Sequence, residues 1–253
     1  MRMAQLRENF YLAFGLWFHF WLIPITIMGG LGAICASLLD RTGELVQRAA
    51  RSWARALVWV GRISVEVKGM EHLVPGQNYI FAANHRSNFD IYVLLAFLPG
   101  IFAFVAKKSL FRIPLFGQAL QSLGCVPVDR NNVQNAIHCL NEAAARIRQG
   151  KSMIIFPEGT RATTPELLPF KKGVFIMAMK AGKPVVPVAV NGTRFVQPRS
   201  TFRVKPGKVQ VVICPPIFPE NFRRKEELMA AVQRSLAATY DPDFPYGPGG
   251  GNE

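Results

Sequence analysis

The chain has 253 residues, half of them apolar, which is enough for one large α/β domain with a short anchor or tail. Its 30 Lys and Arg residues against 16 Asp and Glu give a formal charge of +14, and this excess predicts an anionic partner, either nucleic acid or anionic lipid. The spacing of the four cysteines (Cys35, Cys125, Cys139 and Cys214) argues against a disulfide framework and a metal site, so we expect reduced, buried thiols.

The first part of the chain is unusually apolar. Residues 9–39 carry no formal charge over 31 residues, which is too long for a signal peptide and favours a lipid partner over nucleic acid. A straight helix of this length would measure about 46 Å, whereas the hydrocarbon core of a bilayer is roughly 30 Å thick. One possible arrangement of this segment is a single tilted or kinked membrane span. A buried helix of a soluble protein is the arrangement that we favour least. Because Pro24 divides the run into two halves too short to cross, we favour a hairpin of two short helices within one leaflet.

Residues 43–61 have the pattern of a basic amphipathic helix. One face carries Arg48, Arg51, Arg55 and Arg62, and the opposite face carries Val46, Ala50, Trp53 and Leu57. This pattern is typical of an interfacial helix whose arginines reach anionic headgroups. The alternative is a surface helix that packs on its own domain. The Lys and Arg residues that follow Leu39 predict that this side of the membrane is the cytoplasmic one.

From residue 63 onward, short apolar runs alternate with helical patterns. The expected strands are 63–68, 79–83, 152–156, 185–190 and 208–213, and the expected helices are 91–98, 134–148, 173–181 and 225–238. This alternation predicts an α/β fold with a mixed, largely parallel sheet flanked by helices. We expect an N-terminal membrane-anchoring segment over residues 1–61, a catalytic body over 62–240 and a disordered tail over 241–253, which is rich in Pro and Gly.

Three polar motifs follow apolar strands, where ligands collect in such sheets. The first is NHRSNFD, residues 84–90, in which His85 and Asp90 would lie about 140° apart on one continuous helix and could pair only across a turn. An aspartate that accepts from one imidazole nitrogen leaves the other free to remove a proton from a hydroxyl. Because no serine or cysteine has the setting of a nucleophile, direct transfer to a bound acceptor fits better than an acyl-enzyme.

The other two motifs carry cations. In FPEGTR, residues 156–161, Arg161 can bind a phosphate bidentately, Gly159 lets backbone amides approach it, and Glu158 could orient a polar headgroup. Lys107 and Lys108 come between an apolar strand and an apolar helix, a plausible phosphate contact. Each motif also has a non-functional alternative: an ordinary turn with a surface arginine for the first, and a solvated lysine pair for the second. Both are common in proteins.

Together the motifs resemble the lysophosphatidic acid acyltransferase family, the 1-acyl-glycerol-3-phosphate acyltransferases, over most of residues 63–239. The four conserved blocks of that family are matched in order by NHRSNFD, by KKSLFRIPLFGQ with GCVPVDR, by FPEGTR with PFKKG, and by VVPVAVNG. Two departures are Arg86, where many members have a neutral residue, which could alter acceptor choice, and the alanine after FPEGTR, where serine is common.

The resemblance implies a role for each matched residue. His85 is similar to the catalytic base of the family and Asp90 to its partner, Lys107 and Arg161 match positions that hold the acceptor phosphate, and Glu158, Gly159 and Thr160 match the acceptor-binding loop. The implied reaction moves an acyl group from acyl-CoA or acyl-carrier protein to the sn-2 hydroxyl of 1-acyl-glycerol-3-phosphate and yields phosphatidic acid.

The family also implies a two-helix N-terminal membrane motif, an apolar tunnel for the acyl chain, and no metal or bound cofactor. We therefore expect membrane lipids, and no nucleic acid, as partners. The expected location is the cytoplasmic face of a membrane, namely the bacterial inner membrane. The nearest alternatives are the same chemistry on glycerol 3-phosphate, a lyso-ornithine lipid or another lysophospholipid, and then a non-catalytic lipid-binding membrane protein.

Overall fold

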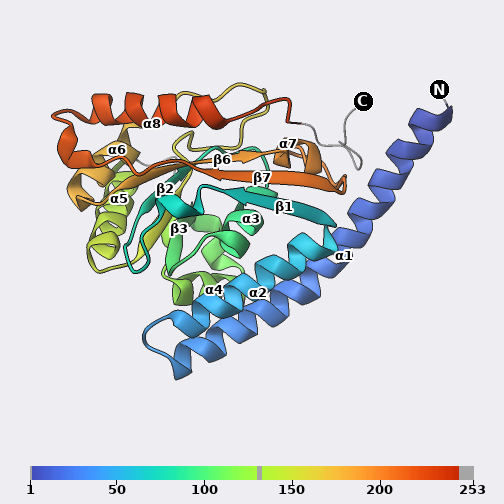
Figure 1. Ribbon diagram of the computed structural model, residues 1–253. Helices are drawn as coiled ribbons and strands as arrows, with labels where there is room; N and C mark the ends of the chain where they lie inside the picture. Colours follow the sequence, from blue (N-terminus) through green and yellow to red (C-terminus); the bar gives the residue numbers. More distant parts are fainter. Residues whose placement is uncertain (1, 130–132, 245–253) are drawn as a thin grey trace.

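The computed structural model describes residues 2–129 and 133–244, in which helices surround one sheet (Figure 1). The strands are β1 (Ile63–Lys68), β2 (Ile80–Ala83), β3 (Phe102–Lys107), β4 (Val126–Val128), β5 (Ser152–Ile155), β6 (Val185–Asn191) and β7 (Gly207–Ile213). The α-helices are α1 (Arg2–Leu39), α2 (Glu44–Val60), α3 (Phe89–Phe97), α4 (Phe116–Leu123), α5 (Val133–Arg148), α6 (Lys172–Ala181), α7 (Thr193–Val196) and α8 (Lys225–Thr239). Short 3-10 helices are η1 (Met70–His72), η2 (Lys108–Arg112) and η3 (Pro219–Asn221).

Within the described residues the sheet has seven strands in the order β1-β7-β6-β2-β5-β3-β4. Neighbouring strands are parallel throughout, except that β7 runs antiparallel to β6. This confirms the mixed, largely parallel sheet. The expected strands and helices from residue 63 onward recur with boundaries shifted by a residue or two, and β3 is the apolar strand expected before Lys107.

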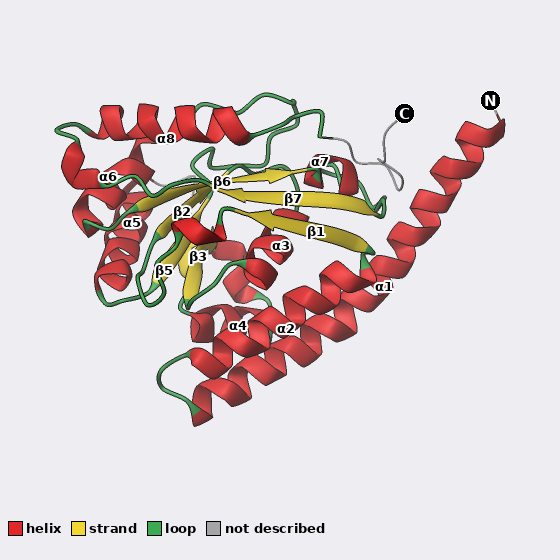
Figure 2. Cartoon of the chain, viewed as in Figure 1, coloured by secondary structure: helices red, strands yellow, loops and turns green. Residues whose placement is uncertain are grey.

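The sheet lies between two helical layers. Helices α6 and α8 cover one face, and α2, α3 and α4 cover the other, with α1 lying outermost along α2 (Figures 1 and 2). Every residue of β2, β5 and β6 is buried, which explains why these strands read as continuous apolar runs instead of alternating ones. The three central strands therefore form a rigid support for the loops that follow their carboxyl ends.

The hairpin expected within residues 9–39 is wrong, because α1 continues through Pro24 as one helix of 38 residues. A proline removes one backbone hydrogen bond and costs about 3 kcal/mol in a soluble helix. Here α1 packs on the body on both sides of Pro24: Phe18 lies against Phe89 with ring centroids 5.0 Å apart, and the Trp53 side chain covers Gly29. These contacts hold the helix continuous, so the proline does not end it.

The chain reverses instead at residues 40–43, so α1 and α2 form the two-helix motif. Asp40 accepts hydrogen bonds from the amides of Thr42 and Leu45, at 2.8 and 2.9 Å, and Gly43 has a φ of 85°, which favours glycine. These hydrogen bonds lower the pKa of the Asp40 carboxyl to about 2, because they stabilise its charged form. The turn is thus encoded by an aspartate and a glycine that follow the apolar run.

Helix α2 packs on its own domain, the alternative to a lipid-facing helix. Its apolar face is buried, with Leu57 and Ala54 fully so. Arg51 donates to the carbonyls of Leu98 and Gly100, both at 2.7 Å, and Arg55 donates to the carbonyl of Ala96 at 3.3 Å. Two arginines that the pattern assigned to headgroups therefore bind the carbonyl end of α3, where positive charge is favourable.

Three of the four cysteines are buried, and part of the C-terminal tail has a defined structure. Cys125, Cys139 and Cys214 are buried free thiols as expected, and burial raises the pKa of Cys125 and of Cys139 to about 11. Cys35 differs, because it is exposed on α1. Of the expected disordered tail, residues 245–253 lie outside the described part, whereas the amide of Asp241 donates to the Asn191 side chain at 3.0 Å.

Candidate active site

Three neighbouring strands, β2, β5 and β3, deliver the polar motifs to one edge of the sheet. The order β2-β5-β3-β4 places their carboxyl ends side by side, and β2 leads into Asn84 and His85, β5 leads into Phe156, and β3 ends at Lys107. Because parallel strands end at the same edge, residues as far apart in sequence as His85 and Glu158, which are separated by 73 positions, meet there. The site is therefore a product of the sheet order and of the turn that follows each strand.

The His85 and Asp90 side chains pair as the motif predicts. Nδ1 of His85 lies 2.8 Å from Oδ2 of Asp90, and the same oxygen accepts from the backbone amides of Arg86 and Ser87 at 2.6 and 2.8 Å. The imidazole stacks on the Phe156 ring with centroids 3.9 Å apart and an interplanar angle of 15°. Asp90 thus fixes the orientation of the ring, and Nε2 is the nitrogen that faces away from this contact.

Glu158 lies beneath the cleft and does not line it. Its side chain is fully buried, and the carboxylate accepts from the His85 amide at 2.9 Å, from the Leu168 amide at 2.8 Å and from Nη1 of Arg86 at 2.8 Å. These hydrogen bonds occupy both oxygens of the carboxylate, so Glu158 needs no contact with a lipid headgroup to satisfy its acceptors. The structure therefore places Glu158 as a carboxylate that holds the backbone of His85.

Arg86 completes this buried pair. Its guanidinium also donates to the carbonyls of His85 and Glu166, at 3.1 and 3.0 Å, and to the Tyr240 hydroxyl at 2.8 Å, with the Tyr240 ring 4.9 Å away. Burial lowers the pKa of Arg86, but the carboxylate of Glu158 and the Tyr240 hydroxyl more than offset this and raise it above its ordinary value. Arg86 therefore stays charged, and it joins the turn that holds His85 to the end of α8.

The loop after β5 is bonded directly to the turn after β2. The Ala162 amide donates to the His85 carbonyl at 2.9 Å, and Nη1 of Arg161 donates to Oδ1 of Asn88 at 2.9 Å. Gly159 has a φ of 73° and lies against the side chain of Lys171, so this tight turn favours glycine. The two motifs thus form one rigid unit in which Arg161 has a defined position beside His85.

A cleft of about 640 Å³ opens above this unit. Of the predicted residues, His85, Lys107, Lys108, Thr160 and Arg161 line it, whereas Asp90, Glu158 and Gly159 lie behind its wall. The further polar lining residues, which the motif analysis did not single out, are Asn88, Ser109, Arg112, Asp129 and Arg199. No spacing pattern in the sequence marks Arg199, because it lies in an irregular loop after α7. The cleft therefore places the His85 imidazole beside several cationic side chains.

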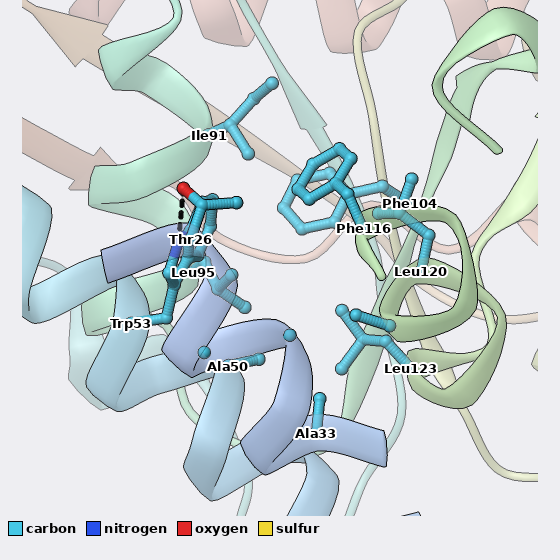
Figure 3. A pocket seen from close by; sticks show the side chains of 13 residues that line it. Thr26, Ala33, Ala50, Trp53, Ile91, Leu95, Phe104, Phe116, Leu120 and Leu123 are labelled. Atoms are coloured by element: carbon cyan, nitrogen blue, oxygen red, sulfur yellow. Dashed lines mark hydrogen bonds between the residues drawn. The ribbon is translucent and has the colours of Figure 1, made fainter. Parts of the chain in front are cut away.

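An apolar cavity adjoins the cleft and shares Ile91, Phe104, Phe116 and Leu120 with its wall. Figure 3 shows side chains from α1, α2, α3 and α4 surrounding it, with the indole of Trp53 donating to Thr26 at 3.2 Å. Gly29, Gly30, Ala33 and Ala50 keep this space open because their side chains are small. The anchor helices thus form one wall of a hydrophobic space that leads away from His85.

Both the sequence and the fold of this chain are similar to those of known proteins. The acyltransferase family model matches residues 64–191. A 1-acyl-sn-glycerol-3-phosphate acyltransferase alpha of Homo sapiens is 31% identical over 193 residues, which cover 75% of this chain and 68% of that protein. This chain belongs to the acyltransferase family. The same family includes a chloroplastic 1-acyl-sn-glycerol-3-phosphate acyltransferase of Brassica napus, 34% identical over 78% of this chain and 60% of that protein.

The fold of this acyltransferase has a solved counterpart. The crystal structure of the 1-acyl-sn-glycerophosphate acyltransferase of Thermotoga maritima superposes with a TM-score of 0.81 at 29% identity and covers 94% of this chain and 99% of that one. The chain spans only about half to three fifths of the length of several plant relatives. The likeness in fold therefore extends over nearly the whole chain and includes the helices before the catalytic body.

Proposed function

We propose that this protein transfers a fatty acyl group from a thioester to the sn-2 hydroxyl of 1-acyl-glycerol-3-phosphate and so forms phosphatidic acid. The observation that carries the proposal is the bonded His85–Asp90 pair in a cleft that also holds Lys107 and Arg161 and adjoins an apolar cavity. The acceptor needs a base, a counter-charge for its phosphate and an apolar space for a chain, and the cleft offers each. The relatives named for this activity support the same choice.

In the reaction, Nε2 of His85 takes the proton of the acceptor hydroxyl while Asp90 stabilises the imidazolium that forms. The acceptor oxygen attacks the thioester carbonyl, and the tetrahedral intermediate collapses with cleavage of the C–S bond. The departing sulfur takes the proton from the His85 imidazolium, so the carrier leaves as a thiol and the neutral imidazole is restored. Lys107 and Arg161 bind the acceptor phosphate by charge-assisted hydrogen bonds. Asn88 holds Arg161 in place through the 2.9 Å bond.

An assay of purified membranes tests the proposed acceptor. Lysophosphatidate, glycerol 3-phosphate, a lyso-ornithine lipid and lysophosphatidylcholine are offered in turn, each with acyl-CoA or with acyl-carrier protein. We expect product only from an acceptor that carries a phosphate monoester, and most from lysophosphatidate. Equal use of lysophosphatidylcholine would contradict the assignment of Lys107 and Arg161 to a phosphate monoester.

Replacing Arg161 by alanine is expected to weaken use of the acceptor and to affect the donor little. Loss of one charge-assisted phosphate contact costs on the order of 1.5–3 kcal/mol, which is roughly a 10- to 100-fold rise in the KM for lysophosphatidate. Steady-state kinetics with each substrate varied in turn measures this. The matched control is Arg234→Ala, because Arg234 lies on α8 and does not line the cleft. Equal effects on donor and acceptor would make Arg161 structural.

We also propose that α1 lies within one leaflet at the cytoplasmic face. A stretch of α1, Gln5–Leu39, is long and apolar enough to cross a membrane, and only 17% of its most apolar window is buried. Contacts with the body are nevertheless spread along the helix, from Gly15 against the backbone of Phe202 to Gly30 against Leu115. A helix tied to the body over this length, about 22 Å, is unable to cross the bilayer unless the body enters it.

Labelling of the amino end tests this arrangement. Leu6 is 66% exposed near the start of α1, so Leu6→Cys, with Cys35, Cys125, Cys139 and Cys214 replaced by serine or alanine, provides a single reporter thiol. We expect it to resist a membrane-impermeant maleimide in intact cells and to react after the cells are opened. Rapid labelling from outside would show instead that α1 crosses the membrane.

A further inference from the structure

A second hollow lies beside the catalytic cleft, at the carboxyl end of β6. Its volume is about 260 Å³, and its polar lining consists of Arg86, Thr163, Thr164, Arg194 and Arg199. Arg199 lines the cleft as well, so the two spaces adjoin at this residue. The hollow shares no lining residue with the apolar cavity next to the cleft. It is therefore a basic space that is separate from the path of a lipid chain.

Two of the three arginines that line this hollow, Arg194 and Arg199, form no ion pair within the described part of the chain. Nη1 of Arg194 is buried and has no hydrogen-bond partner among residues 2–129 and 133–244. Its guanidinium lies 4.6 Å from the centroid of the Phe195 ring. Arg199 donates to the Arg161 carbonyl at 3.0 Å, and in the described part of the chain no carboxylate forms an ion pair with Arg194 or Arg199.

The third arginine of the hollow is different, because Arg86 is already neutralised by Glu158. A buried guanidinium donor without an acceptor is unfavourable, and an anionic oxygen would satisfy it. The hydroxyls of Thr163 and Thr164 are neutral donors at the exposed rim. The chemistry of the lining thus fits a phosphate group that arrives from water.

The position of the hollow distinguishes it from the acceptor site. In the strand order β6-β2-β5-β3, His85 follows β2, Lys107 ends β3 and Arg194 follows β6. Two basic groups therefore lie on opposite sides of the catalytic histidine. Both substrates of the proposed reaction carry phosphate when the thioester is an acyl-CoA, and like charges repel, so each phosphate needs a binding place of its own.

We propose that the Arg194 hollow binds a phosphate group of the CoA part of the donor, which makes acyl-CoA a substrate of this enzyme. The inference rests on the proposed function and deepens it, because that function leaves the thioester carrier open. The phosphate of the lipid acceptor has the same binding chemistry, but the Lys107 and Arg161 side of the cleft adjoins the apolar cavity and the Arg194 hollow does not.

Binding of free CoA tests the site without turnover. Calorimetric titration of the detergent-solubilised full chain compares wild type, Arg194→Gln and the matched control Arg223→Gln, since Arg223 is exposed and does not line the hollow. We expect Arg194→Gln to weaken CoA binding by about 10- to 100-fold, as for loss of one charge-assisted contact, and Arg223→Gln to have no such effect. Unchanged CoA affinity in Arg194→Gln, or no binding of CoA to the wild type, would overturn the proposal.

Kinetics then separates the two sources of phosphate. With the wild type, we expect kcat/KM for palmitoyl-CoA to exceed that for S-palmitoylpantetheine, which lacks phosphate, and Arg194→Gln to reduce this ratio by about 10-fold or more. The KM for lysophosphatidate should stay unchanged. A higher lysophosphatidate KM with an unchanged donor ratio would assign the hollow to the lipid and overturn the proposal. A wild type that binds CoA but forms no product would contradict the proposed function alone.

Discussion

His85→Ala is expected to lower kcat by about 10²–10⁴-fold while the protein stays folded and bound to the membrane. The imidazole is 8% exposed at the wall of the cleft, and Asp90 orients it through the 2.8 Å contact, so the residue is placed to act as a base. Its removal leaves the backbone contacts with Glu158 and Ala162 in place. Initial rates with saturating lysophosphatidate and thioester measure the effect, and thermal unfolding checks the fold.

The matched control for this experiment is His138→Ala, because His138 is exposed on α5 and does not line the cleft. Asp90→Asn should be severely impaired as well, since an amide does not stabilise the imidazolium. Near-normal turnover in His85→Ala, with His138→Ala unchanged, would exclude His85 as the base.

Glu158→Ala should reduce both stability and turnover. The carboxylate and the Arg86 guanidinium form a buried pair at 2.8 Å, with side chains 0% and 1% exposed. Removing one member of a buried pair leaves an uncompensated charge and costs about 3–5 kcal/mol. The amides of His85 and Leu168 lose their acceptor too. We expect the free energy of unfolding to fall by that amount in denaturant titration, and kcat to fall more than the acceptor KM rises.

Two further variants give this prediction its controls. Glu142→Ala breaks a half-exposed pair with Arg146, which is expected to contribute no more than about 1 kcal/mol. The double variant Arg86→Leu, Glu158→Leu leaves no unpaired charge, so part of the stability should return while the low kcat persists. If Glu158→Ala instead raises the acceptor KM at unchanged stability, Glu158 contacts the headgroup as its motif suggests.

Contacts between residues of one motif were predicted correctly from the sequence, whereas contacts between distant segments were not. The NHRSNFD spacing correctly implied a turn in which His85 meets Asp90, because both partners lie within five residues and local geometry decides their contact. The FPEGTR motif gave the right location for Thr160 and Arg161 in the cleft wall. It did not reveal that Glu158 points beneath the cleft, since its partner Arg86 lies 72 residues earlier in the chain.

In helices α1 and α2 as well, the sequence predicted the local character of each segment but not its long-range contacts. The apolar run predicted a segment suited to an apolar environment, and the Arg stripe predicted that α2 is amphipathic, because both properties follow from composition and periodicity. Whether Pro24 interrupts the run was decided by packing on either side of it, through Phe18 on Phe89 and Trp53 on Gly29. The partners of Arg51 and Arg55 were likewise decided by the position of the carbonyl end of α3.

Sequence alone determined the α/β class, the largely parallel sheet, the family and the His–Asp pair, since these depend on local patterns and short spacings. Only the tertiary structure decided which of the polar residues face the cleft. It placed Arg199 beside Arg161, put Glu158 behind His85 and left Nη1 of Arg194 without a hydrogen-bond partner in the described part of the chain. The physical reason is that the order of strands in a sheet is set by long-range packing, so residues far apart in the chain become neighbours that no local pattern specifies.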